Sequence, residues 1–144
     1  MNAIEISTTA LNVEWRRLEI SALNLANMNS TRGADGSTYQ PLRLLSGPSG
    51  DFRQALAGAS SPQHQRAAGV SVLAVEPTAA GERRVYEPTH PHADADGFVS
   101  YPNVDHAAEM TLMLRASRAY EANLAAIDIA QQMYASAFEL GRGR

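Results

Sequence analysis

The sequence of 144 residues contains no cysteine and no lysine, and all 12 of its basic side chains are arginine. Without cysteine there can be no disulfide, no thiolate metal ligand and no cysteine nucleophile. Without lysine there can be no P-loop lysine, no Schiff-base lysine and no serine–lysine catalytic pair. These absences exclude several classes of enzyme before any motif is considered.

A long apolar run and an excess of positive charge are also missing. No stretch reaches the run of about 18 apolar residues that a membrane span requires. The N-terminus lacks the basic start, apolar block and small-residue cleavage site of a secretory signal, so the residues alone predict a cytosolic protein. The net charge of −3 provides no basic field for phosphates, which argues against general nucleic-acid binding.

The last part of the chain has the pattern of one long helix, because residues 104–140 include no glycine or proline. A typical globular helix has about 11 to 12 residues, so a helix of this length needs a long partner. One apolar stripe follows a spacing of three and four: Met113, Ala116, Tyr120, Ile127, Ala130, Tyr134 and Ala137. Asn123 interrupts the stripe, where a polar group fixes register at some cost in stability. The opposite side carries charged residues, including Glu109, Arg118 and Glu121.

A second helix is predicted at the other end of the chain, where residues 4–28 also lack glycine and proline. The same alternation of four and three recurs at Ile4, Thr8, Leu11, Trp15, Leu18, Ala22 and Leu25. An ordinary amphipathic helix would show a similar stripe, but two such helices in one chain favour a coiled-coil-like stem. Asn24 and Asn27, near the end of this helix, either cap it, hydrogen-bond another helix or chain, or mark where it frays.

The residues between the two helices predict a small β-rich insertion. A glycine-rich turn at Asp35–Gly36 precedes a short strand at residues 39–45, and residues 51–68 have the composition of a loop. Further strands are predicted at residues 69–76, 83–87 and 97–101, which together would form one antiparallel sheet of three or four strands. The prediction is an α+β fold with a discontinuous helical stem (residues 1–30 and 103–144) and an insertion (residues 31–102).

One run has the composition of a metal site: His90, His92, Asp94 and Asp96, followed by Gly97. Aligned with a calcium-binding loop, it lacks a carboxylate at the first position and has Asn103 where the last position requires glutamate. The spacing also differs from structural zinc sites. No GxSxG, HExxH or nucleotide-binding glycine motif is present. The sequence therefore predicts no enzyme, catalytic residue, cofactor or metal, with a small metal-binding module as an alternative.

Two stretches at opposite ends of the chain resemble the bacterial flagellar axial proteins. Residues 23–27 (LNLAN) resemble the helix-ending motif SNLAN, with Leu23 in place of the usual serine. Residues 86–99 resemble the motif YEPxNPxADxxGYV, with His90 where asparagine is usual. Residues 102–105, 109–110 and 116–123 continue the match. The pattern is similar to that of the basal-body proximal rod family, the FlgC family, and leaves residues 46–80 unmatched.

This resemblance implies a structural subunit of the proximal rod, a tubular drive shaft that transmits torque and encloses the export channel. Another rod or hook-basal axial protein is the alternative within the same class. The resemblance also implies type III export without a cleaved signal, which places the protein in the periplasmic part of the basal body. Its partners would be copies of itself, neighbouring rod proteins, and ring and export-gate components, with no nucleic acid, small-molecule substrate or membrane span.

The residues expected at subunit interfaces lie on both helices and combine apolar, aromatic and amide side chains. Such a mixture suits a wet contact between subunits better than an isolated two-helix stem. The predicted interface residues are Leu11, Trp15, Leu18, Asn24, Leu25, Asn27, Met110, Met113, Arg118, Tyr120, Asn123, Ile127 and Tyr134. The helix ends are expected to order only upon assembly.

Overall fold

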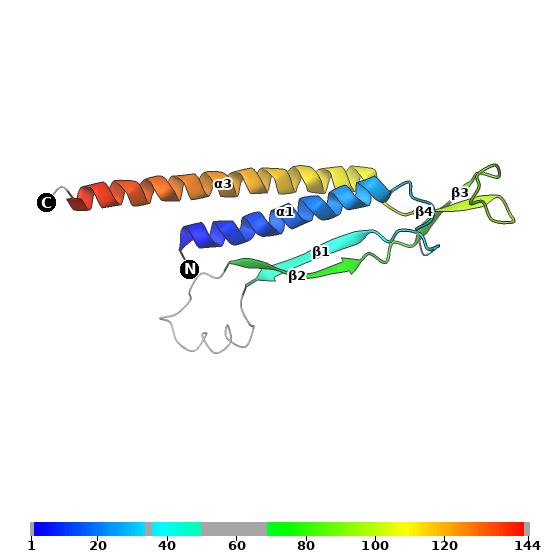
Figure 1. Cartoon of the computed structure of the whole chain (residues 1–144), viewed down its shortest axis with the longest axis horizontal. Helices are drawn as coiled ribbons and strands as arrows, with labels where there is room; N and C mark the ends of the chain where they lie inside the picture. Colours follow the sequence, from blue (N-terminus) through cyan, green and yellow to red (C-terminus); the bar gives the residue numbers. More distant parts are fainter. Residues whose placement is uncertain (1, 34–35, 50–68, 143–144) are drawn as a thin grey trace, which may run out of the picture. The chain divides into compact units, whose positions relative to one another are not determined.

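The computed structural model describes residues 2–33, 36–49 and 69–142 (Figure 1). Its elements are, in chain order, α1 (Ala3–Asn27), β1 (Leu42–Pro48), β2 (Val70–Pro77), β3 (Glu82–Tyr86), β4 (Phe98–Pro102) and α3 (His106–Arg142). The predicted α+β class, with long terminal helices and a small β insertion, is confirmed. The loop predicted at residues 51–68, and Asp35 of the predicted turn, lie outside the described residues. No helix in the described ranges is long and apolar enough to cross a membrane.

Side-chain caps explain where the two helices begin. At the start of α1, Asn2 Oδ1 accepts from the Glu5 backbone N–H at 2.8 Å, while Glu5 Oε2 accepts from the Asn2 backbone N–H at 3.0 Å. This reciprocal pair is a capping box. At the start of α3, Asp105 Oδ1 accepts from the backbone N–H groups of Ala107 and Ala108 at 2.9 and 3.1 Å. The carboxylate satisfies two otherwise free donors and favours the positive end of the helix dipole.

The chain divides into two compact units, and each unit contains part of both helices. Unit 1 comprises Met1–Arg16, Ser46–Leu73 and Ala116–Arg144, and unit 2 comprises Arg17–Leu45 and Ala74–Arg115. In unit 1 the first part of α1 is therefore grouped with α3 from Ala116 onward, whereas in unit 2 the later part of α1 is grouped with the start of α3. The two helices are thus paired in antiparallel order. The predicted boundaries of the stem and the insertion stay a prediction.

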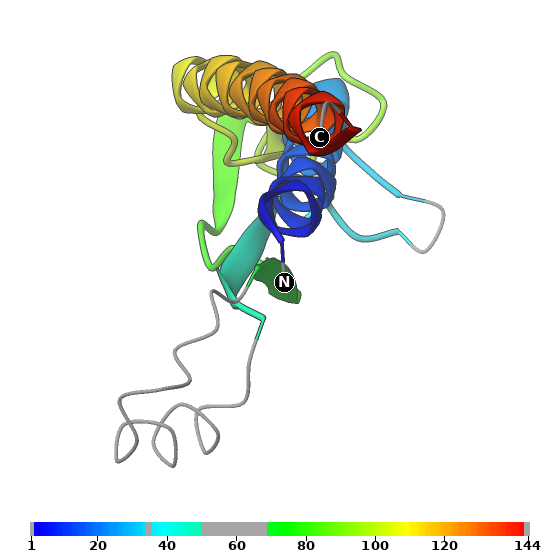
Figure 2. The same cartoon turned by 90° about the vertical axis from the view of Figure 1, so that its left-hand side faces the viewer.

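In unit 1 the two helix segments lie side by side (Figures 1 and 2). Val13 of α1 is 3% exposed and Ala116 of α3 is 1% exposed. The rings of Trp15 and Tyr120 lie 6.3 Å apart, which joins α1 to α3 through an aromatic contact. The Val70 backbone N–H donates to Thr9 Oγ1 at 3.0 Å, so the first residue of β2 is attached to α1.

In unit 2 most of the buried residues come from α1 and β4. Ile20 is 7% exposed, Asn24 is 1% exposed, and Val99 in the middle of β4 is 1% exposed. β4 pairs with β3 in antiparallel register, with Val85 opposite Val99 and Tyr86 opposite Phe98. The Tyr86 and Phe98 rings make an edge-to-face contact with centroids 5.3 Å apart. Small apolar side chains therefore hold this hairpin together on one face, and aromatic contacts hold its end.

Among the described residues the strands form two sheets of two strands each, β1–β2 and β3–β4, and the prediction of a single sheet of three or four strands is wrong. All four predicted strands exist, shifted by one to three residues. Proline is the last residue of β1, β2 and β4. Because proline has no backbone N–H, it cannot donate a further hydrogen bond between the strands. These three strands therefore end at their prolines.

The apolar stripe predicted for α1 is half-buried at Leu11, Leu18 and Leu25, and Trp15 on this stripe contacts Tyr120 of α3. The most buried residues of α1 are Val13, Ile20 and Asn24, whereas Trp15 is 60% exposed. At 100° per residue, Leu11 and Leu18 lie on roughly the opposite side of the helix from Val13 and Ile20. The helix carries apolar residues on two faces, so spacing alone did not identify the face that is most deeply buried within the chain.

Candidate assembly interface

The inner face of α3 in unit 1 matches the stripe predicted from the sequence. Ala116 is buried, and four residues that continue the stripe are half-buried: Tyr120, Asn123, Ile127 and Ala130. Asn123 does not hydrogen-bond α1 in this structure; its Nδ2 donates to the backbone carbonyl of Ala119, one turn earlier, at 2.8 Å. The proposed role of Asn123 in setting register stays a prediction.

The stripe continues beyond the part of α3 that is covered. Residues 131–142 are all exposed, and α3 extends past the first turn of α1 (Figure 1). Tyr134 and Ala137 continue the inner stripe at the same spacing, but Tyr134 is 55% exposed. Met133 and Phe138 are each 68% exposed, and Leu140 is 81% exposed. We call residues 131–142 the α3 overhang; its apolar side chains are uncovered in the free chain.

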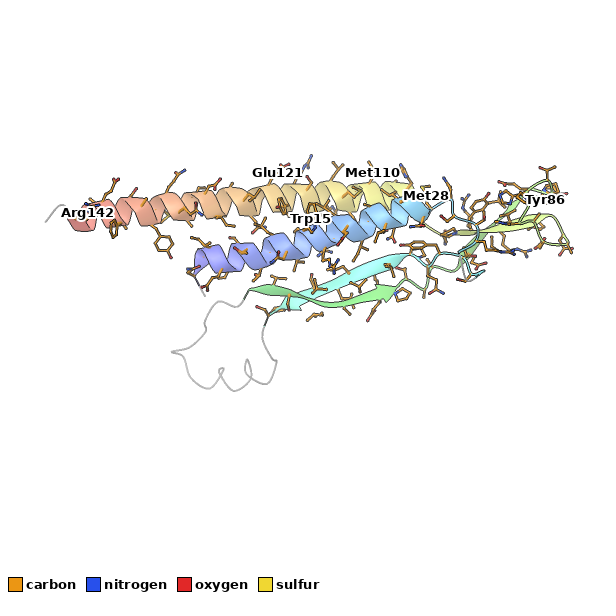
Figure 3. All side chains as sticks on the ribbon, in the orientation of Figure 1. Trp15, Met28, Tyr86, Met110, Glu121 and Arg142 are labelled. Carbon is orange, nitrogen blue, oxygen red and sulfur yellow. The ribbon has the colours of Figure 1, made fainter. Side chains whose placement is uncertain are left out.

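A second, partly exposed surface lies on the side of α1 that bears four of the predicted interface residues. Leu11, Leu18 and Leu25 are half-buried, and Trp15 is largely exposed. In Figure 3 Trp15 is labelled on α1, in the stretch that lies beside α3. Contact with Tyr120 leaves most of the indole surface open. These residues are therefore accessible for further packing.

Asn24 in unit 2 is buried by contacts within its own chain. Its Nδ2 donates to the Leu42 carbonyl at 2.8 Å and to Glu109 Oε1 at 2.7 Å. Its Oδ1 accepts from the Leu42 backbone N–H and from the Tyr39 hydroxyl, both at 2.9 Å. The side chain thus connects α1, the start of β1 and the first turn of α3. Of the possibilities open for Asn24, a hydrogen bond to another helix is the one found.

Glu109 lies on the inner side of α3, which corrects its assignment to the polar side. It precedes Met113 by four residues and Ala116 by seven, so it continues the same stripe. Its Oε1 accepts from Asn24, while its Oε2 is buried with no hydrogen-bond partner among the described residues. Burial, and then the nearby charge of Glu109, raise the pKa of Tyr39. The spacing could have identified Glu109; no local signal pointed to Tyr39.

The remaining predicted interface residues take less central positions. Asn27 makes local bonds near the end of α1: its Nδ2 donates to the Leu23 carbonyl at 2.9 Å, and its Oδ1 accepts from the Ser30 hydroxyl at 3.3 Å. Met110 is 42% exposed, Met113 is half-buried and Arg118 is exposed on α3. Figure 3 labels Met110 and Glu121 on α3.

The run considered as a metal site forms the connection between β3 and β4. Asp94 Oδ1 accepts from the backbone N–H groups of Asp96 and Phe98 at 3.0 and 2.8 Å, and Asp94 pairs with Arg84. These bonds, led by that from Phe98, lower the pKa of Asp94. Gly97 closes the turn at a φ of 81°, a conformation that favours glycine. Within the described ranges, no group of three or more metal-ligating side chains is gathered around a common point.

The antiparallel helix pair with an uncovered apolar end defines a structural protein that assembles with other chains. Residues 95–140 match the family model described as the C-terminal part of the flagellar basal body rod FlgEFG proteins. The chain is 34% identical over 142 residues to the flagellar basal-body rod protein FlgC of Salmonella typhimurium, covering 99% of this chain and 98% of that protein.

Other relatives agree along nearly the whole chain. FlgC of Escherichia coli O6:H1 is 35% identical over 143 residues, covering 99% of this chain and 98% of its own. FlgC of Bacillus subtilis is 31% identical over 146 residues, covering 98% and 97%. The chain belongs to the FlgC family of flagellar basal-body rod proteins, and the resemblance found in its sequence is confirmed.

Proposed function

We propose that this protein is a structural subunit of the flagellar proximal rod, where its terminal helices pack with those of neighbouring subunits into a tube around the export channel. Its membership of a basal-body rod family supports a role as a rod component. The α3 overhang is the observation that carries the assembly part of the proposal, because it exposes tyrosine, phenylalanine, methionine and leucine side chains. A contiguous apolar surface of this kind marks a site of protein contact.

The overhang and the partly exposed side of α1 carry similar kinds of side chain. The overhang supplies Tyr134 and Phe138, and α1 supplies Leu11, Trp15 and Leu18. Aromatic and aliphatic side chains of this type dominate the centres of protein interfaces. We propose that, in a stack of subunits, the overhang of one copy or of a neighbouring rod protein covers this part of the next subunit.

The partners are copies of this chain and other rod proteins, and contacts with ring and export-gate components complete the proposal. The subunit acts by transmitting torque through packed helices and not by catalysis. It reaches the periplasmic rod by type III export without a cleaved signal peptide. The family name supports the rod as its location; export and periplasmic position are inferences from that location.

Complementation tests the proposed function. Cells that lack their own copy of the gene would be supplied with this chain, and swimming would be scored together with the protein content of isolated basal bodies. We expect restored swimming and recovery of the full-length chain, with its first residues intact, in the rod fraction. Restored swimming with the chain absent from purified basal bodies would contradict a structural role.

A further inference from the structure

The turn between β3 and β4 contains a histidine that acts as a hydrogen-bond acceptor. Nδ1 of His90 accepts from the backbone N–H of His92 at 3.0 Å. Nδ1 of His92 in turn lies 2.7 Å from the hydroxyl of Thr31, in the segment after α1. The two imidazole rings are 5.4 Å apart. A chain of two hydrogen bonds thus connects His90, through His92, to the segment that follows α1.

The first of these bonds requires neutral His90. An imidazole nitrogen can accept only while it has a free lone pair, so the ring proton of His90 must lie on Nε2. When the ring gains a second proton, Nδ1 becomes a donor and faces the His92 N–H. The hydrogen bond and the protonated ring are therefore mutually exclusive. Histidine is the side chain that ordinarily changes charge between about pH 5 and 8.

The second bond does not have this requirement. A hydroxyl both donates and accepts, so Thr31 can bond Nδ1 of His92 whether that ring is neutral or protonated. Acid therefore acts on the bond made by His90 and not directly on the bond to Thr31. Loss of the first bond leaves the His92 backbone N–H without this acceptor, while the Ala93 backbone N–H still donates to the His90 carbonyl at 3.0 Å.

Two of the charged groups around the turn are engaged with other partners. Asp94 pairs with Arg84 of β3, and the Glu87 carboxylate accepts from the Tyr101 hydroxyl of β4 at 2.9 Å. The His92 ring lies beside His90, Asp96 lies exposed in the same turn, and Arg32 follows Thr31 in the segment after α1. The bonds of Asp94 and Glu87 hold the second half of the turn and the hairpin, and the His90 backbone N–H donates to the Glu87 carbonyl at 3.0 Å. Protonation of the His90 ring therefore acts on its bond to the His92 N–H and leaves the backbone bonds of the turn in place.

We propose that His90 and His92 form a pH-sensitive latch that holds the β3–β4 turn against the segment after α1. The latch is closed when His90 is neutral and opens when His90 is protonated. Asparagine at this position provides a side-chain oxygen that accepts the same N–H in an Asx-turn and does not titrate. His90→Asn is therefore a matched variant that keeps the bond and removes its dependence on pH.

Nuclear magnetic resonance of the full-length chain, labelled with ¹⁵N, tests the latch because the device does not depend on assembly. The ring ¹⁵N shifts report the tautomer of His90, and amide exchange reports the protection of the His92 N–H. We expect the Nε2–H tautomer at pH 8. Between pH 8 and pH 5 we expect protection, corrected for intrinsic exchange, to fall roughly fivefold, the size expected for one hydrogen bond.

Two variants make the outcome decisive. His90→Asn should keep His92 protected at both pH values, and His90→Ala should leave it unprotected at both. A proton on Nδ1 of His90 at pH 8 would overturn the proposal. So would an equal fall in protection in the wild type and His90→Asn, since both retain His92 and its own titration.

Discussion

Asn24 of α1 donates a hydrogen bond of 2.7 Å to Glu109 of α3, two residues that are 85 positions apart in the chain. The amide group is fully used, because it also bonds both backbone groups of Leu42 and the hydroxyl of Tyr39. An amide in this position determines which turns of the two helices face each other, since a shift by one turn would leave buried polar atoms without partners.

Replacing Asn24 with alanine is expected to destabilise the folded chain by about 2–4 kcal/mol, because it leaves the Leu42 backbone groups and Glu109 Oε1 without their partner. Chemical denaturation followed by circular dichroism measures the change. Asn27→Ala is the matched control, and its local bonds predict a loss of at most about 1 kcal/mol. Equal losses of stability in the two variants would show that the hydrogen bonds from Asn24 to Leu42, Tyr39 and Glu109 add no more stability than the local bonds of Asn27.

The raised pKa of Tyr39 leads us to expect that the free energy of unfolding falls at alkaline pH. The pKa of Tyr39 is raised by burial and by the charge of Glu109, so the folded state holds the phenol proton more tightly than the unfolded chain does. That contribution is complete below about pH 10 and is lost as pH rises through the folded-state pKa. Tyr101, whose pKa is raised mainly by its hydrogen bond to Glu87, acts in the same direction.

Tyr39→Phe should therefore make the decline of unfolding free energy above pH 10 less steep. Denaturant unfolding at a series of pH values from 8 to 12 measures this decline. The combination with Tyr101→Phe should flatten it further, because the second contribution is removed as well. An unchanged slope in Tyr39→Phe would mean that its pKa is the same in the folded and unfolded states.

The α3 overhang should matter for assembly and not for the stability of the free chain. Phe138→Ser together with Leu140→Ser is expected to change the unfolding free energy by less than about 0.5 kcal/mol, since both side chains are mostly exposed. The same variant should fail to enter the rod and should abolish swimming. Ala135→Ser, also exposed in the overhang, is the control and should swim normally. Normal assembly of the double variant would remove the overhang from the proposed interface.

Tyr120 and Asn123 provide a test of subunit register. Tyr120 contacts Trp15 of α1 within the chain. Among the described residues, Asn123 donates its side-chain hydrogen bond to Ala119 of its own helix. Tyr120→Ala should therefore reduce both monomer stability and rod assembly, whereas Asn123→Ala should reduce assembly with little change in the monomer. Denaturation curves and swimming assays separate the two effects. Wild-type swimming in Asn123→Ala would show that Asn123 does not specify register.

The helices, the four strands and the inner stripe of α3 could be predicted from the sequence because each depends on local pattern. The most deeply buried face of α1 could not be predicted in this way. Leu11 and Trp15 lie on one side of α1 and Val13 and Ile20 on the other, and both sides are apolar. Spacing reports that a face is apolar but not whether its own chain or another subunit covers it.

The central polar contacts were also only partly predictable. The sequence indicates Asn24 as a side chain able to bond another helix, but its partners Tyr39 and Leu42 lie 15 and 18 residues away, just before and at the start of β1. No periodic signal links such positions. The division into two sheets likewise depends on which strands pair, and strand patterns predict existence better than pairing.

The most direct test of the central claim is cryo-electron microscopy of isolated basal bodies that contain this chain. We predict that α1 and α3 appear as an antiparallel pair within each rod subunit, with residues 131–142 packed against a neighbouring subunit. A map in which that segment faces open solvent, or in which the two terminal helices of one subunit are separated, would contradict it.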